Sequence, residues 1–165
     1  MSHLSRAVGQ TADAAEDHTK ELVEALGRRG WGVATAESLT GGTIATVLAA
    51  APSSGDWLRG GVVAYSPEVK FGLLEVPRGS VVTQECARTM AESTARLLGA
   101  DLCVAVTGVG GPDPDEGEPA GTVWFAVRSP SGVRTQKARF EGSPPEVIVA
   151  TTQRAIALLR EAAQG

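Results

Sequence analysis

Apolar positions divide the sequence into two kinds of segment. In some segments they recur every three or four residues, which is typical of amphipathic helices, and in others they run together or alternate, which is typical of strands. The predicted helices are residues 11–29, 43–51, 67–74, 83–98 and 144–163. The predicted strands are residues 31–36, 60–65, 101–106, 121–128 and 133–140.

Helices alternate with strands along most of the chain, and this order favours an α/β layered fold. The last two strands flank Pro130-Ser131-Gly132, which predicts a hairpin and therefore a mixed, mostly parallel central sheet. Residues 1–10 are predicted to be a flexible tail. Because no repeat or linker divides the remainder, residues 11–165 are predicted to form a single domain.

The composition supports one small globular domain. The chain has 165 residues, of which 42% are hydrophobic and 21% charged, so extensive disorder is excluded. Only 4% are aromatic, so small and branched aliphatic side chains must form the core. The 20 glycines exceed the usual share and are expected in specific turns and loops.

Charge and hydropathy bear on partners and location. The net charge is −4 and no run of Lys or Arg occurs, which argues against a nucleic-acid partner but leaves a small bound anion open. No apolar run approaches the roughly 20 residues of a membrane span, and the first residues lack the apolar core of a signal peptide. We therefore expect a cytoplasmic protein with no membrane partner.

Sparse cysteine and histidine limit the chemistry. Cys86 and Cys103 form no CxxC motif, and His3 and His18 are the only histidines. A Ser-His-Asp triad and a multi-histidine metal site are therefore not expected, and we predict no metal. A hydrolase built on this sequence needs a base other than imidazole.

Ser38 is the first candidate for chemistry. It follows a predicted strand and precedes a helix that begins after Gly41-Gly42. Unpaired backbone N–H groups at a helix start attract negative charge and can stabilise an oxyanion, so a serine there is a candidate nucleophile. The alternative interpretation is an ordinary capping or turn serine.

Lys70 is the candidate base. Ser66-Pro67 predicts a helix start, which places Lys70 near the positive end of a helix. That field and partial burial would lower the lysine pKa, and a neutral lysine can accept a proton from a serine hydroxyl. The alternatives are a solvated surface lysine and, for the neighbouring Tyr65, an edge residue with its hydroxyl in water.

Two loops follow the buried strand at 101–106. The first, residues 107–112, has the pattern GxGG, which matches neither a Walker loop nor a full dinucleotide fingerprint. Its position after a buried strand favours a ligand site, whereas a sharp turn is the alternative interpretation. The second, residues 113–118, is acidic but lacks the spacing of a calcium loop and is predicted to be a solvated turn.

Four blocks of sequence together resemble one family. They are TAESLTGG at 35–42, GGVVAYSPEVK at 60–70, TGVGGPD at 107–113 and PAGTVWF at 119–125. Their order and spacing resemble the CinA C-terminal domain family over roughly residues 15–160. The resemblance implies a three-layer α/β/α sandwich and, because the chain has no room for the domain that precedes this one in longer relatives, a stand-alone form.

The resemblance also implies an activity. It implies a nicotinamide-nucleotide amidase of pyridine-nucleotide recycling, which converts nicotinamide mononucleotide and water into nicotinate mononucleotide and ammonia without a cofactor, and a homodimer. The family's catalytic serine, tyrosine and lysine correspond to Ser38, Tyr65 and Lys70, with Tyr65 relaying the proton. The residues expected to hold the oxyanion and the substrate are Thr40, Gly41, Gly42, Thr107, Gly108, Gly110 and Gly111.

The chain departs from the family pattern in three places. Leu39 stands where many relatives have cysteine, which excludes a thiol nucleophile there. Pro144 and Ile148 stand where relatives commonly have arginines, and Arg139 is the expected substitute contact for a phosphate. Two further hypotheses therefore stay open, namely a non-catalytic nucleotide-binding or interaction module of the same fold and a hydrolase of another small amide.

Overall fold

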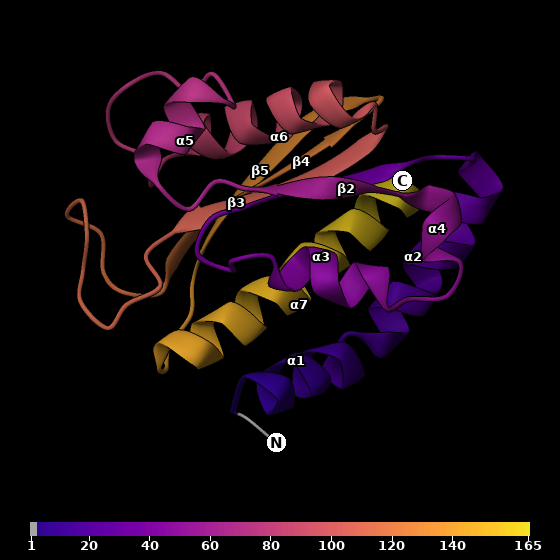
Figure 1. The fold of residues 1–165 in the computed structure, drawn as a ribbon, viewed down its shortest axis with the longest axis horizontal. Coiled ribbons are helices and arrows are strands. Elements are labelled where there is room, and N and C mark those ends of the chain that lie inside the picture. The colour runs from indigo at the N-terminus through magenta and orange to yellow at the C-terminus, as the bar shows by residue number, and fades with distance from the viewer. Residues whose placement is uncertain (1–2) are drawn as a thin grey trace.

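The computed structural model describes the backbone of residues 3–165 and the side chains of these residues except 3, 4 and 7. Its centre is a mixed five-stranded sheet with the order β2-β1-β3-β4-β5 (Figure 1). The strands are β1 (Val33–Glu37), β2 (Leu58–Val63), β3 (Leu102–Gly108), β4 (Thr122–Ser129) and β5 (Gly132–Arg139). β1 pairs in parallel with β2 and β3, whereas β4 is antiparallel to both β3 and β5. The predicted hairpin and mixed sheet are confirmed, and β4 alone runs against the other strands.

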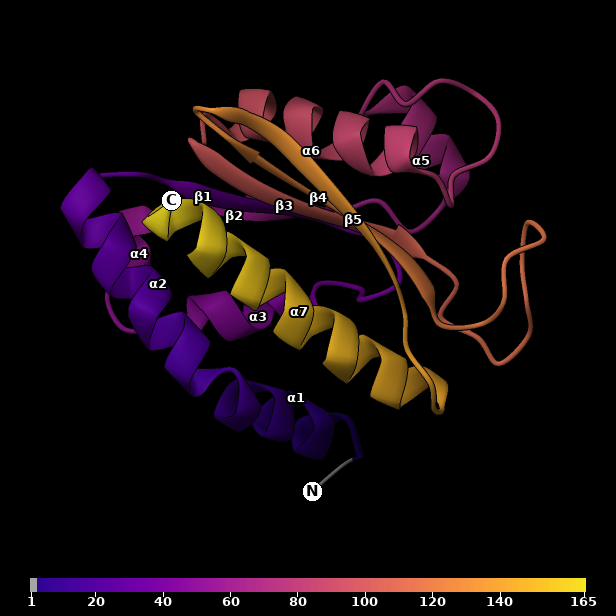
Figure 2. The same cartoon turned by 180° about the vertical axis from the view of Figure 1, so that it is seen from behind.

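Helices cover both faces of the sheet and complete the three layers. They are α1 (His3–Ala14), α2 (Glu16–Arg29), α3 (Thr43–Ala49), α4 (Ser54–Trp57), α5 (Pro67–Gly72), α6 (Gln84–Leu98) and α7 (Pro144–Gln164). Figures 1 and 2 show α5 and α6 on one side and α1, α2, α3 and α7 on the other. The α/β/α sandwich is therefore confirmed. No helix within the described range is long and apolar enough to cross a membrane.

The N-terminal region differs from the prediction. A loose tail over residues 1–10 is wrong for residues 3–10, which belong to α1, and residues 1–2 lie outside the described range. The helix predicted over 11–29 is divided at Ala15, which is fully buried. α1 contacts α3 and α7, and such tertiary contacts stabilise a helix that the sequence pattern did not indicate.

Strand β3 shows how the two cores are built. Leu102, Val104 and Val106 belong to the core beneath α7, and Cys103 and Ala105 belong to the core beneath α6. The alternation follows from the two-residue period of a strand. The buried strand residues on the α6 face are alanines and one cysteine, in keeping with the core of small side chains that the low aromatic content predicts.

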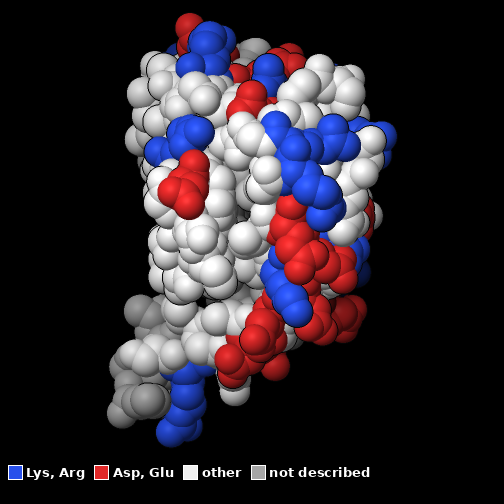
Figure 3. Space-filling model, turned by 90° about the vertical axis from the view of Figure 1, so that its right-hand side faces the viewer, with Lys and Arg blue, Asp and Glu red and all other residues white. Residues whose placement is uncertain are grey.

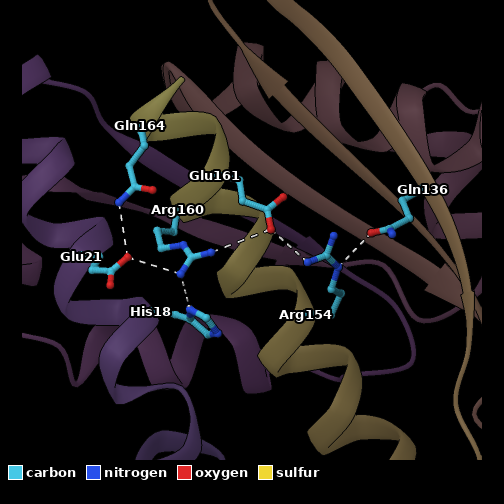
Figure 4. A network of polar contacts seen from close by, with 7 residues as sticks. All are labelled: His18, Glu21, Gln136, Arg154, Arg160, Glu161 and Gln164. Carbon is cyan, nitrogen blue, oxygen red and sulfur yellow. Dashed lines mark hydrogen bonds and ion pairs between the residues drawn. The ribbon is translucent and has the colours of Figure 1, made fainter.

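Polar contacts hold α7 in place at its C-terminal half. Figure 4 shows the Arg160 guanidinium against His18 and Glu21 of α2, at 2.8 and 3.3 Å. Arg154, one turn and a half earlier, donates to Gln136 of β5 at 2.9 Å and to Glu161 at 3.0 Å. α7 is thereby tied to α2 and to the sheet. His18, expected to take no part in catalysis, is engaged in this network.

Charges of both signs lie together on the surface. On the face shown in Figure 3, basic side chains adjoin acidic ones along one side of the molecule, next to a largely uncharged area. The ion pairs there and elsewhere are solvent-accessible, and such pairs contribute little to stability. Stability therefore comes mainly from the two apolar cores.

We expect Ile156→Ala to lower the free energy of unfolding by about 2–5 kcal/mol, because Ile156 of α7 is completely buried against the sheet and its loss leaves a cavity. Denaturant titration measures the change. The matched control is Leu97→Ala on α6, where the side chain is 50% exposed and the expected loss is below about 0.5 kcal/mol. Equal losses in the two variants would contradict the assignment of α7 to the main core.

Candidate active site

Ser38 lies at the carboxyl end of β1, an interior strand of the sheet. It directly follows the last residue of that strand and is 6% exposed. The turn after it places Gly41 and Gly42 at φ values of 57° and 99°, which favour glycine, and then enters α3. A strand, a tight turn and a helix therefore fix the position of the hydroxyl group.

Lys70 reaches Ser38 from α5. The helix begins at Pro67, and the Ser66 hydroxyl caps it by accepting from the Glu68 N–H at 3.2 Å. The Lys70 side chain is only 2% exposed, and its Nζ lies 2.9 Å from Ser38 Oγ. Two residues 32 positions apart in sequence are therefore in direct hydrogen-bond contact, as the Ser-Lys hypothesis requires.

Burial is the main influence on the Lys70 amine. Removal from water lowers the pKa of Lys70 below its ordinary value, and the charges of Cys86 and Glu116 act weakly in the opposite direction. The sequence argument emphasised the start of the helix, but Lys70 lies in the last turn of α5. Desolvation, rather than the helix field, therefore favours the neutral amine that a base requires.

Tyr65 is placed differently from the expected relay. Its side chain is 70% exposed, and its backbone carbonyl accepts from Lys70 Nζ at 3.3 Å. Since Lys70 Nζ and Ser38 Oγ already touch, no phenol is needed between them. The contribution of Tyr65 that the structure shows is a backbone acceptor that orients the lysine.

Ser38 and Lys70 open onto a cavity of about 430 Å³. Its walls are the glycine loop, the acidic loop and the first turn of α7, through Pro144 and Ile148. The predicted substrate-loop residues that line it are Thr107, Gly108, Gly110 and Gly111. Tyr65 also lines this cavity. The cavity therefore brings together most of the site residues that the sequence predicts.

Some predicted residues lie elsewhere. Thr40 and Gly41 line a neighbouring cavity of about 400 Å³ rather than the cavity at Ser38. Gly42 and Arg139 line neither of these two cavities. Arg139 is exposed at the end of β5, so the phosphate contact proposed for it has no support from its position.

Two residues of the glycine loop have structural reasons for their identity. The Thr107 hydroxyl donates to the Val81 carbonyl at 2.7 Å, which ties β3 to the segment before α6. A Cβ at Gly108 would collide with the Thr122 carbonyl and lie 2.9 Å from Val123 Cα. Glycine at 108 is therefore required by the close approach of β4, independently of any ligand.

Glu37 is a residue of the site that the sequence analysis missed. It is fully buried, and its carboxylate accepts from the Thr40 hydroxyl at 2.7 Å and from the Ile44 and Ala45 N–H groups at 2.9 Å each. It thereby fastens the Ser38 turn to the start of α3. The sequence does carry a signal for this role, because Glu37 is an acidic residue at the end of an apolar strand and four positions before Gly41-Gly42.

These contacts change the expected oxyanion site. The Gly41 N–H donates to the Ser38 carbonyl at 3.0 Å. The Ile44 and Ala45 N–H groups of α3 donate to the Glu37 carboxylate. Gly41 is therefore not a free oxyanion donor.

Glu116 was also missed. Its carboxylate accepts from the Val82 N–H at 2.8 Å and the Val81 N–H at 3.0 Å. The acidic loop is thereby attached to the segment before α6. Residues 113–117 are exposed, as expected of a solvated turn, and this attachment is what the prediction lacked. Within the described part of the chain, no three His, Cys, Asp or Glu side chains cluster as metal ligands do.

We expect Glu37→Gln to lower the free energy of unfolding by about 1–3 kcal/mol, because the amide NH₂ would face N–H and O–H donors and leave at least one buried group unpaired. Thermal or denaturant unfolding measures the loss. Glu85→Gln, which removes an exposed carboxylate from the first turn of α6, is the control and should cost less than about 1 kcal/mol. A Glu37 variant as stable as this control would show that the carboxylate does not hold the turn.

Known proteins have the same fold and are similar to this chain in sequence. The family model of the CinA C-terminal domain matches residues 15–163. The crystal structure of a CinA superfamily protein from Klebsiella pneumoniae has a TM-score of 0.86 and 36% identity, with 91% of this chain and 98% of that chain covered. A superfamily protein from Escherichia coli has a TM-score of 0.85 and 33% identity, with 89% and 90% covered.

Longer relatives contain the same region. A protein of Desulforamulus reducens named as competence-damage inducible is 39% identical over 138 residues, which cover 81% of this chain and 34% of that protein. A CinA-like protein of Frankia casuarinae is 36% identical, with 81% and 32% covered. The chain thus spans about a third of the length of these curated relatives. The chain belongs to the CinA C-terminal domain family.

Proposed function

We propose that this chain is an amidohydrolase in which Ser38 is the nucleophile and Lys70 the general base. The observation that carries the proposal is the 2.9 Å contact between Lys70 Nζ and Ser38 Oγ, both buried at the wall of a cavity. A buried lysine amine whose pKa is lowered by desolvation, next to a serine hydroxyl, is an arrangement that can activate a serine without histidine. The family resemblance implies the substrate, the carboxamide of nicotinamide mononucleotide.

The proposed reaction has two halves. The neutral Lys70 amine takes the proton of Ser38 Oγ as the oxygen attacks the carboxamide carbon, and it then returns that proton to the departing nitrogen, so that ammonia leaves. Water, deprotonated by the same amine, next attacks the acyl ester, and the proton goes back to Ser38 Oγ. N–H groups of the turn at 38–42, other than that of Gly41, would stabilise the oxyanion.

The first test is ammonia release from nicotinamide mononucleotide. We expect steady release with the unaltered chain and a loss of at least about a thousandfold with Ser38→Ala, because the acyl enzyme cannot form. Binding of the nucleotide to Ser38→Ala, measured by calorimetry, should persist. Binding to both proteins without ammonia from either would instead support a non-catalytic nucleotide-binding module.

The second test is the pH dependence of kcat/KM. Because only the neutral amine accepts a proton, the rate should rise as the pH rises through the Lys70 pKa. Burial lowers that pKa, so the midpoint should lie below about 10.4, the value of an ordinary lysine. Lys70→Arg should abolish this limb together with the activity, since guanidinium stays protonated. Near-normal turnover by Lys70→Arg would contradict a general base at this position.

A further inference from the structure

The cavity at Ser38 offers little positive charge to a ligand. Lys70 is the one Lys or Arg among the described residues that line it, and its amine is engaged with Ser38. The aspartates Asp113 and Asp115 also line the cavity and are exposed. A phosphate dianion would therefore meet carboxylates without a guanidinium or a free ammonium group among these lining residues.

The helix start at the cavity is also unsuited to an anion. The N-terminus of a helix ordinarily attracts phosphate through its free N–H groups. In α7 the first two residues are Pro144 and Pro145, which have no N–H. Glu146 adds a carboxylate that accepts from both the N–H and the hydroxyl of Ser143 at 2.7 Å, and these hydrogen bonds lower its pKa and keep it charged. The α7 residues that line the cavity are Pro144, which has no N–H, and the aliphatic Ile148.

The other helix start beside Ser38 is already occupied. The Ile44 and Ala45 amides of α3 donate to the Glu37 carboxylate. These two N–H groups are therefore not free to bind an anionic ligand group.

The cavity at Ser38 adjoins a second cavity whose lining is mostly apolar. The neighbouring cavity of about 400 Å³ shares Leu39, Tyr65 and Ile148 with the cavity at Ser38. Beyond these shared residues its walls include Val8 and Val149. A substrate that extends past Ile148 would leave the acidic wall for aliphatic side chains.

Building on the amidase function proposed above, we infer that this site selects carboxamides whose remote end is uncharged or cationic and lacks a phosphate. Nicotinamide riboside and nicotinamide mononucleotide carry the same carboxamide on the same pyridinium ring and differ only in the phosphate. Any attraction of Asp113 and Asp115 for the pyridinium is common to both, so the ratio of their kcat/KM values isolates the contribution of the phosphate.

The experiment measures ammonia release from both compounds by the unaltered chain. We expect the riboside to have a kcat/KM at least equal to that of the nucleotide. A site that binds phosphate with charge-assisted hydrogen bonds would favour the nucleotide by about tenfold or more. A nucleotide preference of that size would overturn the inference and leave the amidase function intact.

Ionic strength supplies a second readout. Raising it from about 0.01 to 0.15 M shortens the Debye length from about 30 to 8 Å. If carboxylates repel the phosphate, the nucleotide-to-riboside ratio should rise with salt, whereas attraction by a cation would make it fall. A falling ratio would contradict the inference.

A charge introduced at Ile148 tests the location. Ile148→Arg should raise the nucleotide-to-riboside ratio by about tenfold, because it adds a guanidinium to the cavity wall. Ile148→Gln, which is polar and uncharged, is the matched control and should leave the ratio within about twofold. An unchanged ratio in Ile148→Arg would show that the phosphate does not reach this wall and would overturn the inference.

Binding separates the two proposals. Calorimetry with Ser38→Ala compares the dissociation constants of the two compounds without any reaction. If neither compound releases ammonia, the amidase function fails, and the binding ratio still decides the inference. Riboside bound at least as tightly as nucleotide supports it, and nucleotide bound tenfold more tightly overturns it.

Discussion

The burial of one amine against one hydroxyl governs this site. Lys70 is taken out of water almost completely, and the polar contacts seen for its amine are Ser38 Oγ and the Tyr65 carbonyl. A charged ammonium is poorly stabilised in such a place, so burial favours the form that can accept a proton. The same burial fixes the distance between Lys70 Nζ and Ser38 Oγ, because a side chain packed on all sides has little rotameric freedom. Reactivity and position therefore have one physical cause.

Three carboxylates arrange the backbone around this pair. Glu37 fastens the Ser38 turn to the start of α3. Glu116 attaches the acidic loop to the segment before α6, and Glu146 accepts from the N–H of Ser143, the residue that precedes α7. In each case a carboxylate satisfies backbone N–H groups that a helix start or loop would otherwise expose. These hydrogen bonds hold the Ser38 turn, the acidic loop and the start of α7 in place around the cavity.

Sequence reasoning reached the layered fold, the hairpin and the Ser38–Lys70 pair, because strand alternation, turn residues and four ordered sequence blocks are local signals. It could not find Glu37 or Glu116, since their partners are backbone groups that meet them only after folding. It also misjudged residues 3–10, whose helix depends on contacts with α3 and α7, and Tyr65, whose exposed ring follows from the course of the chain between β2 and α5. These features depend on contacts between segments that are distant in sequence, and residue types alone do not reveal such contacts.

The position of α7 has a consequence for the order of events in biosynthesis. Ser38 and Lys70, the proposed nucleophile and base, lie in the first half of the chain, but Pro144 and Ile148 line their cavity and belong to the last helix. A chain still emerging from the ribosome therefore carries both reactive groups without an enclosed site. The cavity at Ser38 is therefore complete only once the C-terminal helix has docked on the sheet.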